Sequence, residues 1–234
     1  MATLLRERIT LSVADGTEMD AYVSRPEAAG SLPGLMVLQE AYGVNGHIRN
    51  VADRFAEEGY VAIAPELFHR TARGFEGDYN NFNSVTSHMR AMTLEGNEAD
   101  LRASFDWLSQ QKSVQAGSIS SVGYCMGGRM SFLANAILPL RAAASYYGGG
   151  IATGLLSKAA SLHAPMLFFW GELDQHIPPE QRGAITSALK AASKRYINVE
   201  FSHAGHGFNC DERSSFEPRA SREAWALLLE FLKS

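Results

Sequence analysis

The sequence predicts an α/β fold, in which helices cover both faces of a mainly parallel sheet. Short apolar runs alternate with helix-like segments from residue 35 onward, a pattern that favours a parallel sheet. The runs at residues 35–39 and 60–64 are almost continuously apolar, as in strands buried on both faces. Apolar residues make up 46% and charged residues 20% of the 234 residues, which is enough for one substantial core. We therefore predict a single domain over residues 1–234.

The first two strands are expected at residues 9–13 and 19–24, because Asp15-Gly16 between them is a hairpin signal. Later strands are predicted from short apolar runs, and helices from apolar residues at helical spacing. The later predicted strands are residues 35–39, 60–64, 118–122, 142–147, 165–170 and 196–201. The predicted helices are residues 46–58, 98–111, 126–136, 179–190 and 217–232.

The segment over residues 66–95 interrupts this alternation. Its periodicity fades, and glycines and asparagines punctuate it. A segment of this length inside a compact domain is often functional. We predict a cap or lid-like insertion here, with a passive surface insertion as the alternative.

A glycine-flanked cysteine joins one predicted strand to the next helix. In the pattern Gly123-x-Cys125-x-Gly127, Cys125 stands at the tip of a tight turn, where hydrolases with a nucleophile elbow place their nucleophile. Such a turn strains the backbone and requires small neighbours. It also directs backbone N–H groups and a helix N-terminus at the reacting oxygen. The alternative is a buried structural cysteine, because free cysteine is among the most buried residue types.

An acid and a base follow the elbow in the order that α/β-hydrolases use. Asp174 lies in the loop after the apolar run 165–170, and His206 follows the last predicted strand. We prefer Asp174 to the nearby Glu172 because it lies deeper in the loop. A nucleophile, an acid and a histidine after successive strands predict the α/β-hydrolase fold and a catalytic set of Cys125, Asp174 and His206.

Glu40 is the fourth informative residue, since it follows the buried run 35–39. A carboxylate there is costly without a role or a partner, and an ordinary salt bridge is the alternative. This loop is also where α/β-hydrolases place an oxyanion-hole donor. The predicted donors are the backbone N–H groups of Ala41 and Met126.

The chain resembles the dienelactone hydrolase (carboxymethylenebutenolidase) family over nearly its full length. The resemblance rests on three motifs above all: Gln39-Glu40-x-x-Gly43-Val44-Asn45, Gly123-Tyr124-Cys125-Met126-Gly127-Gly128 and Ala204-Gly205-His206-Gly207-Phe208. It implies a Cys125–His206–Asp174 triad, a role for Glu40 against the resting thiol, and hydrolysis of esters or lactones through an acyl-enzyme. We expect no cofactor.

The sequence departs from the family at the substrate carboxylate. Well-studied members hold it with two arginines, and the position of one, four residues after the histidine, is Cys210 here. Arg70 and Arg90 are candidates for the other, and Arg73 is a further one. Three aromatic residues are candidates for lining an acyl pocket: Tyr42, Tyr147 and Phe208.

Composition limits the partners of the protein. A net charge of −4 and a pI near 6.0, with no basic stripe, argue against nucleic acid. No apolar run approaches the ~18 residues of a membrane span, and two cysteines fit a reducing compartment. We expect a cytoplasmic protein that acts on a small molecule without a metal, because the histidines are scattered. The oligomeric state is not readable from the sequence.

Two other functions stay open for this set of residues. The first is thioesterase or acyltransferase chemistry on the same framework. The second is a thiol redox sensor without enzymatic activity, in which Cys210 would resolve an oxidised Cys125.

Overall fold

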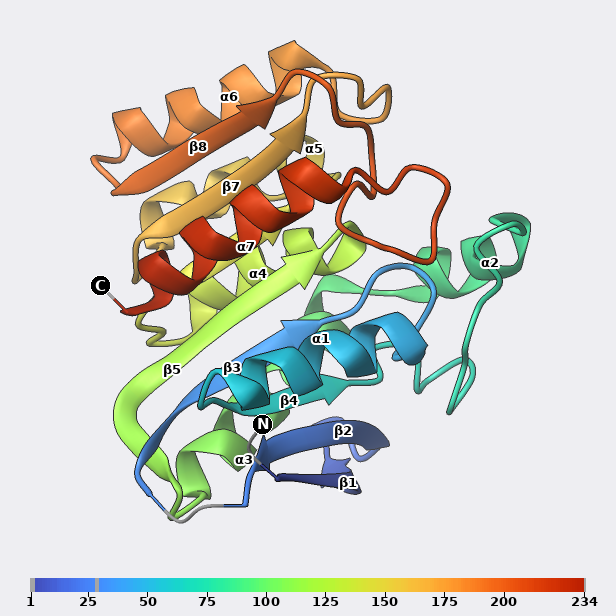
Figure 1. Cartoon of the computed structure of the whole chain (residues 1–234), viewed down its shortest axis with the longest axis vertical. Coiled ribbons are helices and arrows are strands. Elements are labelled where there is room, and N and C mark those ends of the chain that lie inside the picture. The colour runs from blue at the N-terminus through green and yellow to red at the C-terminus, as the bar shows by residue number, and fades with distance from the viewer. Residues whose placement is uncertain (1–2, 28–29, 234) are drawn as a thin grey trace. The chain divides into compact units, whose positions relative to one another are not determined.

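A computed structural model describes residues 3–27 and 30–233 of the chain (Figure 1). The chain divides into two compact units, Met1–Ser120 and Ser121–Ser234. The described strands follow the sheet order β1-β2-β4-β3-β5-β6-β7-β8, and β5 continues from the first unit into the second. This mainly parallel eight-stranded sheet with its helices confirms the predicted fold class.

The first unit contains the antiparallel part of the sheet. Strands β1 (Leu4–Ser12) and β2 (Glu18–Pro26) form a hairpin from Leu4↔Pro26 to Ser12↔Glu18. Gly16 in its turn has a φ of 85°, which glycine adopts without strain. Strand β2 pairs antiparallel with β4 (Val61–Pro65), and β4 pairs parallel with β3 (Leu32–Leu38). Both predicted hairpin strands are therefore present and longer than expected.

Two helices of the first unit begin at polar caps. The side chain of Asn45 accepts a hydrogen bond from the N–H of Ile48 at the start of α1 (Gly46–Glu57). Thr93 accepts one from Gly96 at the start of α3 (Leu94–Gln110). Such caps satisfy N–H groups that have no partner inside the helix. Because of the Thr93 cap, α3 begins before the predicted residue 98.

The irregular segment 66–95 contains a helix that the sequence pattern did not reveal, α2 (Asn83–Ala91). A hydrophobic cluster packs this segment against the loop that follows β3. The members of the cluster are Ala41, Tyr42, Phe75, Tyr79, Val85 and Met89. The segment is thus anchored within the first unit by its apolar side chains, and its role as a cap stays a prediction.

The strands of the second unit are all parallel. The carboxyl-terminal half of β5 (Val114–Tyr124) pairs with β6 (Ala143–Tyr146), which pairs with β7 (Met166–Gly171). Strand β7 in turn pairs with the edge strand β8 (Tyr196–Phe201). The arrowheads of β5, β7 and β8 point the same way in Figure 1. Loops that leave these strands therefore start at one edge of the sheet, where sites of parallel sheets lie.

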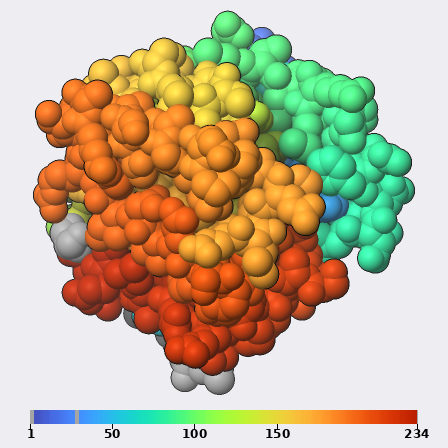
Figure 2. Space-filling view, turned by 90° about the horizontal axis from the view of Figure 1, so that it is seen from above, coloured from blue at the N-terminus to red at the C-terminus, as the bar shows by residue number. Residues whose placement is uncertain are grey.

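The helices of the second unit match their predicted positions closely. They are α4 (Met126–Ile137), α6 (Pro179–Ala191) and α7 (Pro218–Lys233). The orange segments that cover much of Figure 2 include α6 and its neighbouring loops. Two short elements were not predicted, α5 (Ile151–Gly154) and the 3₁₀ helix η1 (Leu156–Ser161), because neither is long enough to produce a helical pattern.

None of the helices in the described part of the chain combines the length and the apolar character needed to cross a membrane. The single-domain organisation over residues 1–234 stays a prediction.

Candidate active site

Cys125 stands at a strained turn between β5 and α4. Its φ of 54° and ψ of −116° are unusual for a residue with a side chain. The Cys125 N–H donates to the Tyr146 carbonyl at 3.0 Å, which fixes the turn to the neighbouring strand. A Cβ on Gly123 would overlap the Gly127 carbonyl, and one on Gly128 would lie 2.8 Å from Gly148 Cα. Glycine is therefore required on both sides of the nucleophile.

The structure brings Cys125, His206 and Asp174 together within the second unit. His206 Nε2 lies 3.1 Å from Cys125 Sγ, and His206 Nδ1 lies 2.7 Å from Asp174 Oδ2. Asp174 is buried, with only 2% of its side chain exposed, and its Oδ1 also accepts the N–H of His176 at 2.8 Å. The turn after β5 places the thiol, the loop after β7 the carboxylate and the loop after β8 the imidazole, and the three groups form one hydrogen-bonded chain.

The surroundings of His206 favour its protonated form. Burial alone would lower the pKa of His206, but the Cys125 thiolate and the hydrogen bonds to Asp174 and Cys125 raise it to about 10. Burial would raise the pKa of Asp174, yet the hydrogen bond and charge of His206 bring it below its usual value. Because Asp174 stays ionised, His206 Nδ1 donates the hydrogen bond and Nε2 faces the sulfur.

Two aromatic rings pack against His206. The Tyr147 ring centroid lies 5.1 Å from that of His206, and the His176 ring lies 5.2 Å away in an edge-on arrangement. Phe208 is fully buried and packs on Tyr147 at 5.3 Å. Tyr147 and Phe208 thus support the histidine loop, and their predicted role in an acyl pocket stays a prediction. The sequence gives His176 a weaker placement than His206, although His176 lies only two residues after Asp174.

Glu40, Ala41 and Tyr42 follow β3 in the first unit, and all three are buried. The Tyr42 ring packs on Tyr79 with centroids 4.5 Å apart. The expected roles of Glu40 against the thiol and of Ala41 in the oxyanion hole stay predictions. Met126 is the first residue of α4, directly after Cys125, where helix N–H groups have no partner within the helix.

The candidate arginines of the first unit differ in their surroundings. Arg70 Nη1 donates to Asp100 Oδ2 at 2.8 Å, and its Nη2 lies 2.6 Å from Asp15 Oδ2. Asp100 is fully buried and also contacts His69 Nε2 at 3.0 Å. The charge of Arg70 is therefore already balanced by two carboxylates. Arg90 is an exposed residue of α2, and the predicted roles of both stay untested.

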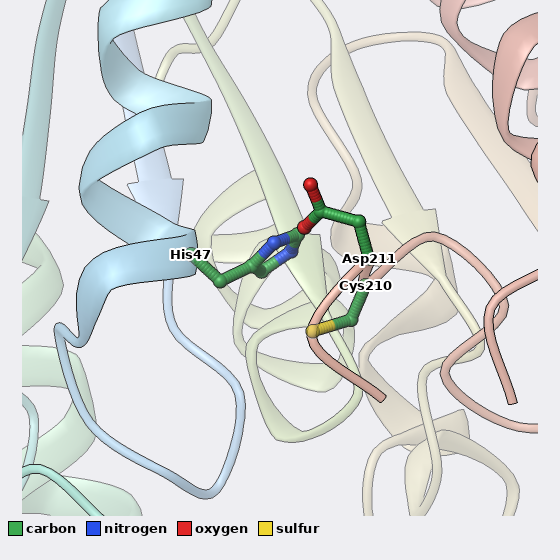
Figure 3. Close-up of side chains that lie close together, drawn as sticks. All are labelled: His47, Cys210 and Asp211. Carbon is green, nitrogen blue, oxygen red and sulfur yellow. The ribbon is translucent and has the colours of Figure 1, made fainter. Parts of the chain in front are cut away.

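Figure 3 shows further side chains that carry metal-ligating atoms. Cys210 and Asp211 belong to the loop after β8 in the second unit, with Cys210 buried and Asp211 exposed. His47 belongs to the first turn of α1 in the first unit and is buried. The expectation that the protein works without a metal stays a prediction.

Comparisons with known proteins agree with the motifs. The model of the dienelactone hydrolase family matches residues 19–234. A Salmonella typhimurium protein named "Putative carboxymethylenebutenolidase" is 34% identical over 235 residues, which cover 95% of this chain and 85% of the relative. Carboxymethylenebutenolidase of Pseudomonas sp. (strain P51) is 32% identical over 233 residues, with 98% and 96% covered.

A solved structure is similar over the whole chain. The crystal structure titled "Putative Dienelactone Hydrolase" from Klebsiella pneumoniae has a TM-score of 0.89 and 30% sequence identity, and 99% of each chain is covered. The family match spans both units of the fold and every motif on which the resemblance rests. The chain therefore belongs to the dienelactone hydrolase family.

Proposed function

We propose that this protein hydrolyses carboxylic esters or lactones, with Cys125 as nucleophile, His206 as general base and Asp174 as the residue that orients the imidazole. The observation that carries this proposal is the hydrogen-bonded chain from Cys125 Sγ through His206 to Asp174, with distances of 3.1 and 2.7 Å. Nucleophilic catalysis requires this arrangement of a nucleophile, a base and an orienting group.

In the first step, His206 takes the Cys125 proton and the sulfur attacks the substrate carbonyl carbon. A C–S bond forms, and the carbonyl π electrons move to oxygen. The N–H of Met126 and, by the family resemblance, that of Ala41 would stabilise this oxyanion. As the tetrahedral intermediate collapses, the C–O bond to the leaving group breaks. The leaving oxygen takes the proton from His206, and a thioester remains on Cys125.

In the second step, water releases the acid. His206 removes a proton from the water as its oxygen attacks the thioester carbonyl, and the C–S bond then breaks. The sulfur leaves as a thiolate and recovers a proton from His206, which restores the resting enzyme. Because a thiolate is a good leaving group, the first intermediate returns to substrate unless the alcohol leaves readily. Enol lactones and aryl esters are therefore the preferred substrates, ahead of amides.

Glu40 belongs to the proposal as an expectation from the family. The matching glutamate is expected to contact the resting thiol and to be redirected when substrate binds. The burial of Glu40 at the end of β3 is consistent with a carboxylate that has a defined partner. A Glu40→Gln variant should alkylate with iodoacetamide at an altered rate in the absence of substrate. An unchanged rate would argue for a purely structural carboxylate.

Hydrolysis of 4-nitrophenyl butyrate by purified variants tests the central assignment. Cys125→Ala should abolish turnover, and Cys125→Ser should keep only weak turnover because a serine hydroxyl ionises far less readily than a thiol. Cys210→Ser is the matched control, because it removes the other cysteine and should keep turnover within a few-fold of wild type. Full activity of Cys125→Ala would refute the proposal. Transfer of the acyl group to an added alcohol or amine instead of water would reveal an acyltransferase.

We also propose that the substrate is a small molecule and that the protein works in the cytoplasm. Both follow from the family and the composition, and cell fractionation tests the second. Recovery in a membrane or extracellular fraction would contradict it.

A further inference from the structure

His176 is an exposed residue that contacts the proposed general base. Its ring centroid lies 5.2 Å from that of His206, and the two ring planes meet at 79°. Edge-on pairs of this kind are a favourable arrangement of aromatic rings. Tyr147, which also packs on His206, is fully buried, whereas His176 is exposed to solvent. His176 therefore supplies the contact on the solvent side of the imidazole.

The loop that carries His176 is anchored on both sides of this residue. Before it, the N–H of Leu173 donates to the Ala204 carbonyl at 3.0 Å, which joins this loop to the loop after β8. After it, Arg182 Nη1 of α6 donates to the Ile177 carbonyl at 3.2 Å, and Ile177 itself is buried. The backbone around His176 is therefore fixed, although the residue is exposed.

The contact of His176 with the hydrogen-bonded chain has a main-chain part and a side-chain part. Its backbone N–H donates to Asp174 Oδ1 at 2.8 Å, and this bond is kept by every side chain except proline. The ring contact with His206 belongs to the side chain alone. A substitution at residue 176 therefore removes the ring contact and keeps the hydrogen bond that orients the Asp174 carboxylate.

The imidazole of His206 needs support beyond its two hydrogen bonds. Nδ1 lies 2.7 Å from Asp174 Oδ2, and Nε2 lies 3.1 Å from Cys125 Sγ. In the proposed reaction, Nε2 carries the Cys125 proton to the leaving oxygen, so the bond to sulfur is absent during part of the cycle. With 14% of the His206 side chain exposed, water reaches the ring. Misalignment of a catalytic group by small distances is costly in rate, and the neighbouring rings oppose it.

We propose that His176 is a positioning residue whose ring keeps the His206 imidazole aligned and shields its hydrogen bond to Asp174 from water. This inference rests on the proposed function of His206 as general base. The shape of the ring carries the role, so a phenyl ring in its place would serve and a methyl group would not. An edge-on aromatic contact corresponds to about two- to tenfold in a rate or an equilibrium.

Two variants of His176 separate the ring from its nitrogens. His176→Ala removes the ring, and His176→Phe keeps an aromatic ring without ring nitrogens. His163→Ala is the matched control, because His163 is an exposed histidine that precedes β7, at the other end of the strand from Asp174. With 4-nitrophenyl butyrate, His176→Ala should lower kcat/KM about two- to tenfold. His176→Phe and His163→Ala should match wild type. Both positions are exposed, so folding is a small risk.

Proton NMR gives a second readout that needs no turnover. The His206 Nδ1 proton is identified in protein labelled with ¹⁵N-histidine by its loss in His206→Gln. Its exchange with water should be about two- to tenfold faster in His176→Ala and unchanged in His176→Phe and His163→Ala.

Wild-type turnover or wild-type proton exchange in His176→Ala would overturn the inference, and so would equal losses in His176→Ala and His176→Phe. If wild type hydrolyses no ester, but the exchange is faster in His176→Ala alone, the proposed function fails and the positioning role of the ring stands.

Discussion

The structure defines the effect of Asp174→Asn on the proposed reaction better than that of any other change. The Asp174 carboxylate has 2% of its side chain exposed and accepts a hydrogen bond from His206 Nδ1 at 2.7 Å. A hydrogen bond to a charged group contributes about 1.5–3 kcal/mol, which corresponds to about 10- to 150-fold in rate. An amide NH₂ can instead donate to Nδ1 and thereby hold the wrong tautomer, with Nε2–H facing the sulfur. This second effect raises the expected loss in kcat/KM toward ~10⁴-fold.

The assay is the pH dependence of kcat/KM with 4-nitrophenyl butyrate. Loss of the Asp174 charge should lower the pKa of His206, because that charge is one of the influences that raise it. The deficit in kcat/KM should be present across the neutral pH range. Glu172→Gln is the matched control: it removes an exposed carboxylate from the same loop and should keep wild-type activity. An Asp174→Asn variant within threefold of wild type, or an equal loss in Glu172→Gln, would refute the assigned roles.

Four further predictions concern stability and the elbow. The pKa of Asp174 is lowered by His206, so its stabilisation is present above the unfolded-state pKa and is lost as pH falls through the folded-state value. Urea midpoints between pH 3 and 6 should therefore vary less in Asp174→Asn than in wild type. Gly123→Ala should abolish activity and lower Tm, because the new Cβ would overlap the Gly127 carbonyl; a normal Tm with full turnover would contradict this. Phe208→Ala should cost about 3–5 kcal/mol in urea unfolding, since its ring is fully buried, and a loss below 1 kcal/mol would contradict the packing. Arg70→Met should destabilise the fold by breaking a partly buried ion pair. The ratio of kcat/KM for the anionic 4-nitrophenyl monoester of adipic acid to that for its neutral methyl ester should not change, and a changed ratio would indicate a carboxylate-binding role for Arg70.

Sequence patterns located the strands well because apolar residues either run continuously, as over 165–170, or alternate with polar ones, as over 197–201. The run 165–170 became β7 (Met166–Gly171) and the run 196–201 became β8 (Tyr196–Phe201). Strand β5 starts at Val114, earlier than the predicted residue 118, because the exposed residues Gln115, Ala116 and Gly117 interrupt the apolar pattern there. Helix α2 escaped prediction because asparagines and glycines surround its short pattern.

The sequence also brought out three residues that the structure joins by hydrogen bonds, because each of them lies in the turn or loop after a recognisable strand. The distances between these three side chains and the pKa of His206 depend on how the loops fold. The spacing of residues in the sequence does not determine either of them. The contact between the rings of His176 and His206 also depends on how the loops fold.

Mass spectrometry of the acid-quenched enzyme tests the central claim most directly. Wild-type protein mixed with 4-nitrophenyl butyrate and quenched within milliseconds should gain the mass of one butyryl group, located in the peptide that contains Cys125. Pretreatment with iodoacetamide should remove both this label and turnover. Turnover with no acyl group on Cys125, or with the label on another residue, would contradict the account.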